Sequence, residues 1–515
     1  MRREDSFTLF LLLLAVLFGA YVRLIVPLQA NFPVLDGGLF YTMIQDLLAN
    51  DFRLPLYTSY NHLNIPFAYP PLPLYLAALL HLLSGVDLLE IVRWLPAVFS
   101  LLTLPAFFFL AREMLGSTSQ AALATLLFAL LPRSYEWLIM GGGVTRAPGM
   151  LFLLLFLWMC YRAFANGDRR ATFSAALLGG LVLLSHPERA LHAAVAGLLF
   201  WLWLDRSWAG AQRALVIGGG TLLVSAPWWG SVLARYGVET LAQGAQAAGE
   251  RWLFWAPLLQ LNFTDEMVPI LAFLAVFGAF VAWKSGKGLL AIWFLLVFLT
   301  DPRSAPHVVP IQVALLAALS LSEVLFPALG NAVPNWQAIF LERRGKVFFG
   351  YFLLLLLFNA QWNVLQVQKL VLSNADREAL RWIATHAPAE SRFLVLDWQE
   401  TLTLSPVQEW FPSLSGRMNI VTVQGREWLP GRAHFKVRMD AYEDLYACHY
   451  DRPVCLEQWA DRNGETFDYV YLSMRLPSGD LQISRLADGL RASEAYRLVY
   501  ETPEVWIFER LRPSP

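Results

Sequence analysis

Long apolar stretches alternate with short polar ones up to residue 372 of the chain. A helix that crosses a membrane requires roughly 20 mainly apolar residues. Judged by this length, the pattern predicts eleven membrane-spanning helices, which makes the chain a polytopic α-helical membrane protein. These helices are expected at residues 7–28, 88–111, 119–138, 146–164, 171–185, 189–205, 213–233, 267–283, 288–300, 307–327 and 346–366.

The loop between the first two predicted spans, residues 29–87, contains a further apolar segment at 72–84. This segment is too short to cross the membrane, and we expect it to form a helix lying at the surface. Lys and Arg are more frequent in the loops on the side of the N-terminus, which predicts a cytoplasmic N-terminus in the plasma (inner) membrane. Eleven crossings then place loop 29–87 and the C-terminal region on the outer face.

The pattern changes after residue 372, where charged residues become frequent and apolar runs become short. Residues 1–372 are therefore expected to form the transmembrane domain and residues 373–515 a soluble extracytoplasmic α/β domain. The predicted elements are a helix at 376–386 capped by Ser373 or Asn374, strands at 392–398, 419–425 and 467–474, a helix at 484–495, and a terminal hairpin around Thr502 and Pro503.

Composition agrees with a membrane protein and excludes some functions. Hydrophobic residues make up 57% of the chain and charged residues 15%, and the formal net charge is -1. Such a chain has no overall basic field for nucleic acid, so membrane lipids are the expected surroundings. Cys448 and Cys455 are the only cysteines of the predicted outer domain. They form either a disulfide, which suits an oxidising compartment, or a pair of free thiols.

Ionisable residues of the helical region collect at the predicted outer ends of the helices. Alternating-access transporters usually bind their substrates near the membrane midplane, whereas a cluster at one interface suits chemistry on a lipid headgroup. Arginine binds phosphate through paired hydrogen bonds, and carboxylates serve as general bases or metal ligands. The residues in this cluster are Arg23, Asp36, Arg93, Arg133, Glu136, Arg146, His186, Glu188, Arg189, Arg303 and His307.

Asp36 follows the first predicted span, in the sequence VLDGGLFYTMIQDLL. One interpretation makes it a catalytic carboxylate, with Gly37 and Gly38 leaving room for a ligand to approach the backbone. The other makes it the N-cap of the helix that follows.

The run Gly141 to Gly143 leads into a predicted helix that carries Arg146. It predicts either an anion site at a helix N-terminus or a flexible turn capped by Thr145. Arg303 and His307, in the last polar loop on this side, are further candidates for binding a phosphate.

Two more loops contain site candidates. Ser185 and Glu188 fit a capping box, which competes with a role for His186 and Glu188 in the site. In the stretch 60–76, Tyr69 and His62 are candidates to line the same site.

These motifs together resemble a known class of enzymes. The motifs are V-L-D-G-G-L-F-Y with its Asp36, Y-P-P-L-P-L-Y-L before the surface helix, A-R-E-M-L-G at the end of a span, and an acidic loop with Glu136. The arrangement resembles the GT-C class of integral-membrane glycosyltransferases over residues 1 to about 330. That class includes protein O-mannosyltransferases, the aminoarabinose transferase of lipid A and oligosaccharyltransferase catalytic subunits.

The resemblance implies a polyprenyl-phosphate-linked sugar as donor and a glycan, lipid or protein as acceptor. It implies that Asp36 acts as general base and that Arg303 and Arg146, with His307, bind the donor phosphate. Glu136 matches the acid of the second outer loop, and with Asp36 it would hold a divalent metal, Mg or Mn, if one is used. Many members carry an Asp-Glu pair in the first loop, whereas Gly37 follows Asp36 here, so metal use stays open. The alternatives are a transporter or flippase of lipid-linked sugar and a non-enzymatic membrane protein that displays an outer domain.

Overall fold

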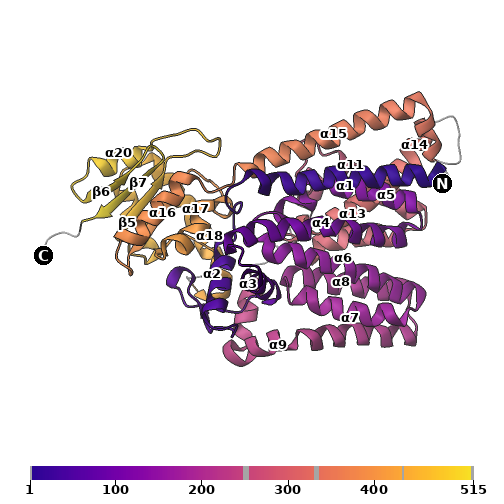
Figure 1. Ribbon diagram of the computed structural model, residues 1–515, viewed down its shortest axis with the longest axis horizontal. Helices are drawn as coiled ribbons and strands as arrows, with labels where there is room; N and C mark the ends of the chain where they lie inside the picture. Colours follow the sequence, from indigo (N-terminus) through magenta and orange to yellow (C-terminus); the bar gives the residue numbers. More distant parts are fainter. Residues whose placement is uncertain (1–2, 247–254, 330–335, 432–433, 512–515) are drawn as a thin grey trace.

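The computed structural model describes residues 3–246, 255–329, 336–431 and 434–511. Its first part is a bundle of long helices that run in roughly the same direction, and its last part is a mixed domain seated at one end of that bundle (Figure 1). We call the end of the bundle that faces the C-terminal region the site end.

Each of the eleven predicted spans coincides with a helix. These helices are α1 (Arg3–Gln29), α4 (Leu88–Leu115), α5 (Thr118–Leu130), α6 (Gly143–Asn166), α7 (Arg169–Leu183), α8 (Pro187–Leu204), α9 (Trp208–Gln246), α11 (Ile270–Lys284), α12 (Gly288–Thr300), α13 (Pro310–Leu319) with its continuation through α14 (Phe326–Leu329), and α15 (Arg343–Gln368). By length and composition, six helices of the described residues are long and apolar enough to cross a membrane: α1, α4, α6, α9, α13 with α14, and α15. The number of crossings therefore stays a prediction.

The helices pack into a bundle with α5 and α13 inside. Helix α1 contacts α5 and α15, α4 contacts α5 and α6, and α6 contacts α7 and α8. Every residue of α13 is buried. In contrast, α1, α9 and α15 expose large apolar side chains such as Leu17, Leu223 and Tyr351. Such a surface suits contact with lipid tails and is unsuited to contact with water.

One predicted span is too long. The span expected at 119–138 ends as α5 at Leu130, and residues 132–138 form two short 3-10 turns, η2 (Pro132–Ser134) and η3 (Glu136–Leu138). Pro132 follows the helix end, and proline disfavours a helical conformation in the residue before it. The side chains of Arg133 and Glu136 therefore lie in a loop at the site end.

The predicted surface helix is present. It is α3 (Leu72–Ser84), and its bounds match the predicted segment. Helix α2 (Gly38–Ala49) and a short hairpin of β1 (Tyr57–Thr58) and β2 (Ile65–Pro66) precede it. Figure 1 shows α2 and α3 between the helical bundle and the C-terminal domain.

The C-terminal region combines one sheet with helices. The sheet order is β4-β3-β5-β7-β6, in which β4, β3 and β5 are parallel and β5, β7 and β6 are antiparallel. The elements are α16 (Asn374–His386), β3 (Arg392–Leu396), α17 (Pro406–Ser415), β4 (Met418–Asn419), α18 (Phe435–Ala447), α19 (Val454–Asn463), β5 (Tyr469–Ser473), α20 (Arg485–Arg491), β6 (Tyr496–Glu501) and β7 (Val505–Arg510).

Most predicted elements of this region are present, and one is wrong. The Ser373 hydroxyl caps α16, and β6 and β7 form the predicted terminal hairpin. The strand expected at 419–425 stops at Asn419, because the side chain of Asn419 accepts hydrogen bonds from the backbone N–H groups of Val421 and Thr422 and turns the chain. Cys448 and Cys455 form a disulfide with a Cα–Cα distance of 5.7 Å.

Candidate active site

The loop that carries Asp36 packs backbone against backbone with the loop before α6. The N–H of Gly141 donates to the carbonyl of Val34 at 2.9 Å. A Cβ atom placed on Gly141 would lie 1.9 Å from the carbonyl oxygen of Asp36, and one on Gly37 would lie 2.9 Å from the carbonyl carbon of Gly141. The space beside Gly37 that was predicted for a ligand is therefore filled by the protein's own backbone.

The Asp36 carboxylate lies at the N-terminus of α6. Its Oδ1 accepts from the N–H of Gly142 at 2.8 Å and from Arg146 Nη2 at 2.9 Å. Its Oδ2 lies 2.8 Å from Arg146 Nη1, so the ion pair is bidentate, and the Asp36 side chain is only 14% exposed. The N-cap interpretation is wrong, because the N-cap of α2 is Gly37. The anion at the glycine run is Asp36 itself, which explains why this acid meets a helix N-terminus 106 residues away.

Arg146 also connects Asp36 to aromatic groups. Its Nε donates to the carbonyl of Trp137 at 3.0 Å, and its guanidinium lies over the Trp137 ring at 5.2 Å from the centroid. The same ring is contacted by His307, whose ring centroid is 5.1 Å away, and by the Arg133 guanidinium at 5.9 Å from the centroid. Asp36, Arg146 and His307 are thus brought together around Trp137, although the capping role predicted for Thr145 is absent.

The start of α8 contributes two buried cationic or ionisable side chains. His186 is the N-cap residue and is 6% exposed, and Arg189 is 1% exposed. The predicted capping box is absent, because the Ser185 hydroxyl donates to the carbonyl of Leu181. Among the described residues, Nε and Nη1 of Arg189 and Nδ1 of His186 have no hydrogen-bond partner.

These side chains form part of one cationic cluster. The charges of Arg189, Arg146 and Arg303 all act on His186, and those of Arg189, Arg146 and Arg133 act on His307. Glu188, in the same helical turn, attracts Arg189 electrostatically. A buried guanidinium without acceptors is costly, so this cluster is suited to receive an anion.

Tyr69 lies beside this cluster, and His62 lies outside it. The Tyr69 hydroxyl is 3.3 Å from Oγ1 of Thr145, and the Tyr69 ring centroid is 6.3 Å from His186 and 6.5 Å from Trp428 of the C-terminal region. The exposed His62 instead places Nε2 3.1 Å from the carbonyl of Gly416. The position of His62 therefore does not support its predicted place in the site.

Arg303 occupies the rim of the cluster. It is exposed, and its guanidinium lies over the ring of Phe435 in α18 at 5.1 Å from the centroid. Its loop is tied to α8, because His192 Nε2 lies 2.8 Å from the Ser304 hydroxyl. The loop of residues 301–309 thus links the cationic cluster to the C-terminal domain.

The two acids predicted as metal ligands are both engaged with cations. Glu136 pairs with Arg133 at 3.2 Å and accepts a hydrogen bond from Asn363. Both oxygens of Asp36 are occupied by Arg146 and the backbone of Gly142. No group of three or more His, Cys, Asp and Glu in the described part of the chain is arranged to hold a metal ion. The arrangement does not fit a metal centre, and we derive the chemistry from the side chains alone.

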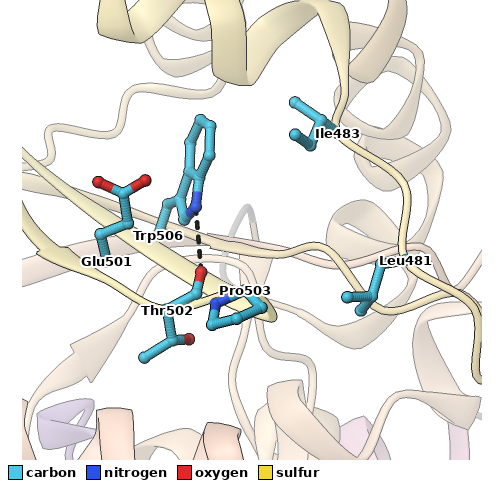
Figure 2. Close-up of a pocket in the computed structure, with 6 residues that line it drawn as sticks. All are labelled: Leu481, Ile483, Glu501, Thr502, Pro503 and Trp506. Carbon is cyan, nitrogen blue, oxygen red and sulfur yellow. Dashed lines mark hydrogen bonds between the residues drawn. The ribbon is translucent and has the colours of Figure 1, made fainter.

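One surface cavity lies apart from this site. It has a volume of about 530 Å³ and is lined by Leu481, Ile483, Glu501, Thr502, Pro503 and Trp506 of the C-terminal domain. Figure 2 shows the Trp506 indole donating its N–H to the carbonyl of Thr502 beside Pro503. All of these residues come from the C-terminal domain, and the one carboxylate among them, Glu501, is paired with Arg491.

Two residues of the site were not predicted as such. The sequence identifies Arg189 only as one of several ionisable residues near the surface. Its burial depends on neighbouring helices, which the sequence pattern does not reveal. Glu409 of α17 is 3% exposed, and its Oε1 accepts from the N–H groups of Gly37 and Leu39 at 3.2 and 3.1 Å. No signal in the sequence near Glu409 indicates this contact with a loop 372 residues away.

Comparison with known proteins supports the resemblance seen in the sequence. The family described as dolichyl-phosphate-mannose-protein mannosyltransferase matches residues 68–230. No curated protein sequence matches the chain.

Solved structures share the fold of almost the whole chain. The archaeal oligosaccharyltransferase AglB from Archaeoglobus fulgidus, in complex with an inhibitory peptide and a dolichol-phosphate, is 14% identical with a TM-score of 0.57, over 92% of this chain and 70% of that one. ArnT from Cupriavidus metallidurans bound to undecaprenyl phosphate is 15% identical with a TM-score of 0.54, over 97% of each chain. The arabinofuranosyltransferase AftD from Mycobacteria is 16% identical with a TM-score of 0.51, over 99% of this chain and 41% of that one.

A further structure of the Archaeoglobus fulgidus oligosaccharyltransferase, in complex with Zn and sulfate, is 15% identical with a TM-score of 0.55, over 90% of this chain and 68% of that one. The structures establish the shared fold, and the family match over residues 68–230 agrees with it. The family match favours a transferase over the transporter and the non-enzymatic anchor. The chain thus has the fold of GT-C membrane glycosyltransferases, and residues 68–230 match a mannosyltransferase family.

Proposed function

We propose that the protein moves a sugar from a polyprenyl-phosphate donor to an acceptor at the outer face of the plasma (inner) membrane, with Asp36 as general base. One observation carries this proposal: an oriented carboxylate adjoins a group of cationic side chains in which Nε and Nη1 of the buried Arg189 have no hydrogen-bond partner among the described residues. Dolichol-phosphate and undecaprenyl phosphate in the similar AglB and ArnT structures support the donor class.

The proposed reaction is a displacement at the anomeric carbon of the donor sugar. The acceptor oxygen, from a glycan, lipid or protein, forms a bond to that carbon while the bond from the carbon to the phosphate oxygen breaks. The electron pair of the broken bond stays on the lipid phosphate, and the proton of the acceptor passes to Asp36. The ion pair with Arg146 fixes the orientation of the Asp36 carboxylate.

The phosphate gains negative charge as this bond breaks. Arg189, Arg303 and Arg146 supply positive charge, and His186 and His307 are candidates to donate hydrogen bonds to it. Because Arg189 and His186 are already buried and fixed, little reorganisation is required when the charge develops. Tyr69 lines the boundary between this cluster and the C-terminal domain, where we place the donor sugar.

The proposal also includes the arrangement in the membrane. Residues 1–372 would form the transmembrane domain with a cytoplasmic N-terminus, and residues 373–515 an extracytoplasmic domain. The disulfide between Cys448 and Cys455 supports an oxidising compartment for that domain.

The test is sugar release from a panel of polyprenyl-phosphate sugars by purified protein in lipid, with candidate acceptors present. Asp36→Asn should remain folded and bind donor, yet transfer sugar about 10²–10⁴ times more slowly. Asp51→Asn, an exposed acid of the same loop, is the matched control and should be unchanged. Equal transfer by wild type and Asp36→Asn would remove Asp36 from the role of base.

A further inference from the structure

Helix α17 of the C-terminal domain packs directly on the loop that carries Asp36. The indole N–H of Trp410 donates to the carbonyl of Leu35 at 3.0 Å, and the Ser413 hydroxyl donates to the carbonyl of Gly38 at 2.8 Å. A Cβ atom on Gly38 would lie 2.5 Å from the carbonyl oxygen of Glu409, so the two segments are in close contact.

Glu409 is the central residue of this contact. Its Oε1 accepts from the N–H of Gly37 and of Leu39, which flank the start of α2, and thus caps a helix that has no cap of its own. Its backbone carbonyl accepts from the Tyr60 hydroxyl at 2.8 Å. Its Oε2 is buried without a hydrogen-bond partner among the described residues.

The loop held in this way has an unfavourable backbone. Leu35 has φ of 57° and Gly37 has φ of 118°, on either side of Asp36. A left-handed conformation is unfavourable for a residue other than glycine, because its Cβ atom comes too close to the backbone. Both backbone groups of Leu35 are bonded to the C-terminal part of the chain, the N–H to the carbonyl of Leu370 and the carbonyl to Trp410. Contacts from beyond the last span therefore hold Asp36 in place.

We propose that Glu409 is a positioning residue for Asp36, so that the C-terminal domain completes the active site by fixing the first outer loop. The proposal rests on the proposed function for the role of Asp36, and it goes further in assigning a catalytic dependence to the C-terminal domain. Glu409 itself does not touch the reacting atoms. It acts by holding the backbone on the C-terminal side of Asp36.

The charge state of Glu409 provides a readout that a merely structural contact lacks. Burial, and secondly the negative charge of Asp36, raise the pKa of the Glu409 carboxyl to about 8. The groups that face it are Asp36 before α2, Glu427 after β4, and Tyr60 in the turn η1 (Tyr60–His62). At neutral pH Glu409 is therefore mostly protonated, and ionisation would place a second negative charge beside Asp36.

The test compares Glu409→Ala, which removes the acceptor, with Glu409→Gln, which keeps an oxygen for both N–H groups. Glu400→Gln, an exposed acid of the same domain, is the control. With folding and donor binding retained, Glu409→Ala should lower kcat on the order of 10²-fold, the effect of misplacing a catalytic group by about 1 Å. Glu409→Gln should restore kcat at pH 7 and remove the loss of activity that wild type shows as pH rises through about 8.

Hydrogen exchange of residues 35–39 gives a readout independent of turnover. Exchange should be faster in Glu409→Ala and near wild type in Glu409→Gln and in the control. If wild type transfers no sugar, the proposed function fails, while this exchange result still decides whether Glu409 holds the loop. A folded Glu409→Ala with unchanged exchange, or with wild-type kcat, would overturn the proposal, as would a Glu409→Gln variant as slow as Glu409→Ala.

Discussion

Two arginines of the helical bundle are almost fully buried, and their surroundings differ sharply. Arg23 in α1 is 0% exposed and donates to the carbonyls of Gly19, Ser100 and Ala129 and to the hydroxyl of Ser134. Arg189 in α8 is 1% exposed, and its Nε and Nη1 find no acceptor in the described residues.

The difference separates a structural charge from a functional one. An ion moved into a protein interior loses several kcal/mol of solvation, which hydrogen bonds have to offset. The acceptors around Arg23 come from three helices and a turn, so this residue fastens the bundle together. For Arg189, no hydrogen bond at Nε or Nη1 offsets this loss of solvation within the described residues. This arrangement is expected of a residue that binds an anion.

The strongest test of this comparison exchanges each arginine for methionine. Arg189→Met should slow transfer by about 10²–10³-fold, as for the loss of one preorganised group that stabilises developing charge. Its thermal midpoint should stay level or rise, because an uncompensated charge is removed. Arg23→Met should instead lower the thermal midpoint, since it leaves buried carbonyls unpaired. Thermal unfolding in lipid measures the stability of both variants. An equal loss of stability in the two would contradict the difference drawn between these arginines.

A smaller effect is expected from crowding the Asp36 carboxylate. A Cβ atom on Gly142 would lie 2.5 Å from Asp36 Oδ2 and 2.8 Å from Arg146 Nη2. Gly142→Ala should therefore separate the ion pair and lower kcat by about 10-fold or more. Gly218→Ala in α9, where a Cβ atom meets no neighbour within 4 Å, is the matched control and should transfer at the wild-type rate. Steady-state kinetics at saturating donor would measure both.

Glu409 extends the comparison to a buried acid whose second oxygen has no partner. Its folded-state pKa of about 8 lies above its ordinary value, so between these two pH values the folded protein holds a proton that the unfolded chain has lost. The contribution of Glu409 to the free energy of unfolding is therefore largest at acid pH and decreases as pH rises toward 8. Glu409→Gln should remove that fall, so its advantage in thermal midpoint over wild type should grow between pH 5 and pH 8. A constant difference across that range would contradict the assigned pKa shift.

The smallest effect is expected from chelation. Asp36 and Glu136 are each paired with an arginine, so neither offers a free carboxylate to a cation. Transfer should be unchanged after treatment with EDTA and after addition of Mg or Mn. A strong loss with EDTA, restored by one of these ions, would mean that the ion pairs rearrange when substrate binds.

The sequence was most informative where structure is local. Apolar run length located every long helix and the helix α3, and the motifs around Asp36 pointed to the GT-C class, which the comparisons support. The geometry of the site depends on contacts between distant segments, which periodicity does not reveal. Arg146 is 110 residues from Asp36, and the contact of Glu409 with Gly37 spans 372 residues. The boundary at residue 372 and the roles of the site residues remain predictions.

The backbone contacts of Leu35 also have a consequence for biosynthesis. Leu370 and Trp410 leave the ribosome long after the Asp36 loop has been made, and chains are synthesised from the N-terminus. The loop reaches its final conformation only when the chain has been made through Trp410, after the whole helical bundle. A truncated chain that stops before Trp410 would lack the contact that holds Leu35, and under the proposed function it would transfer no sugar.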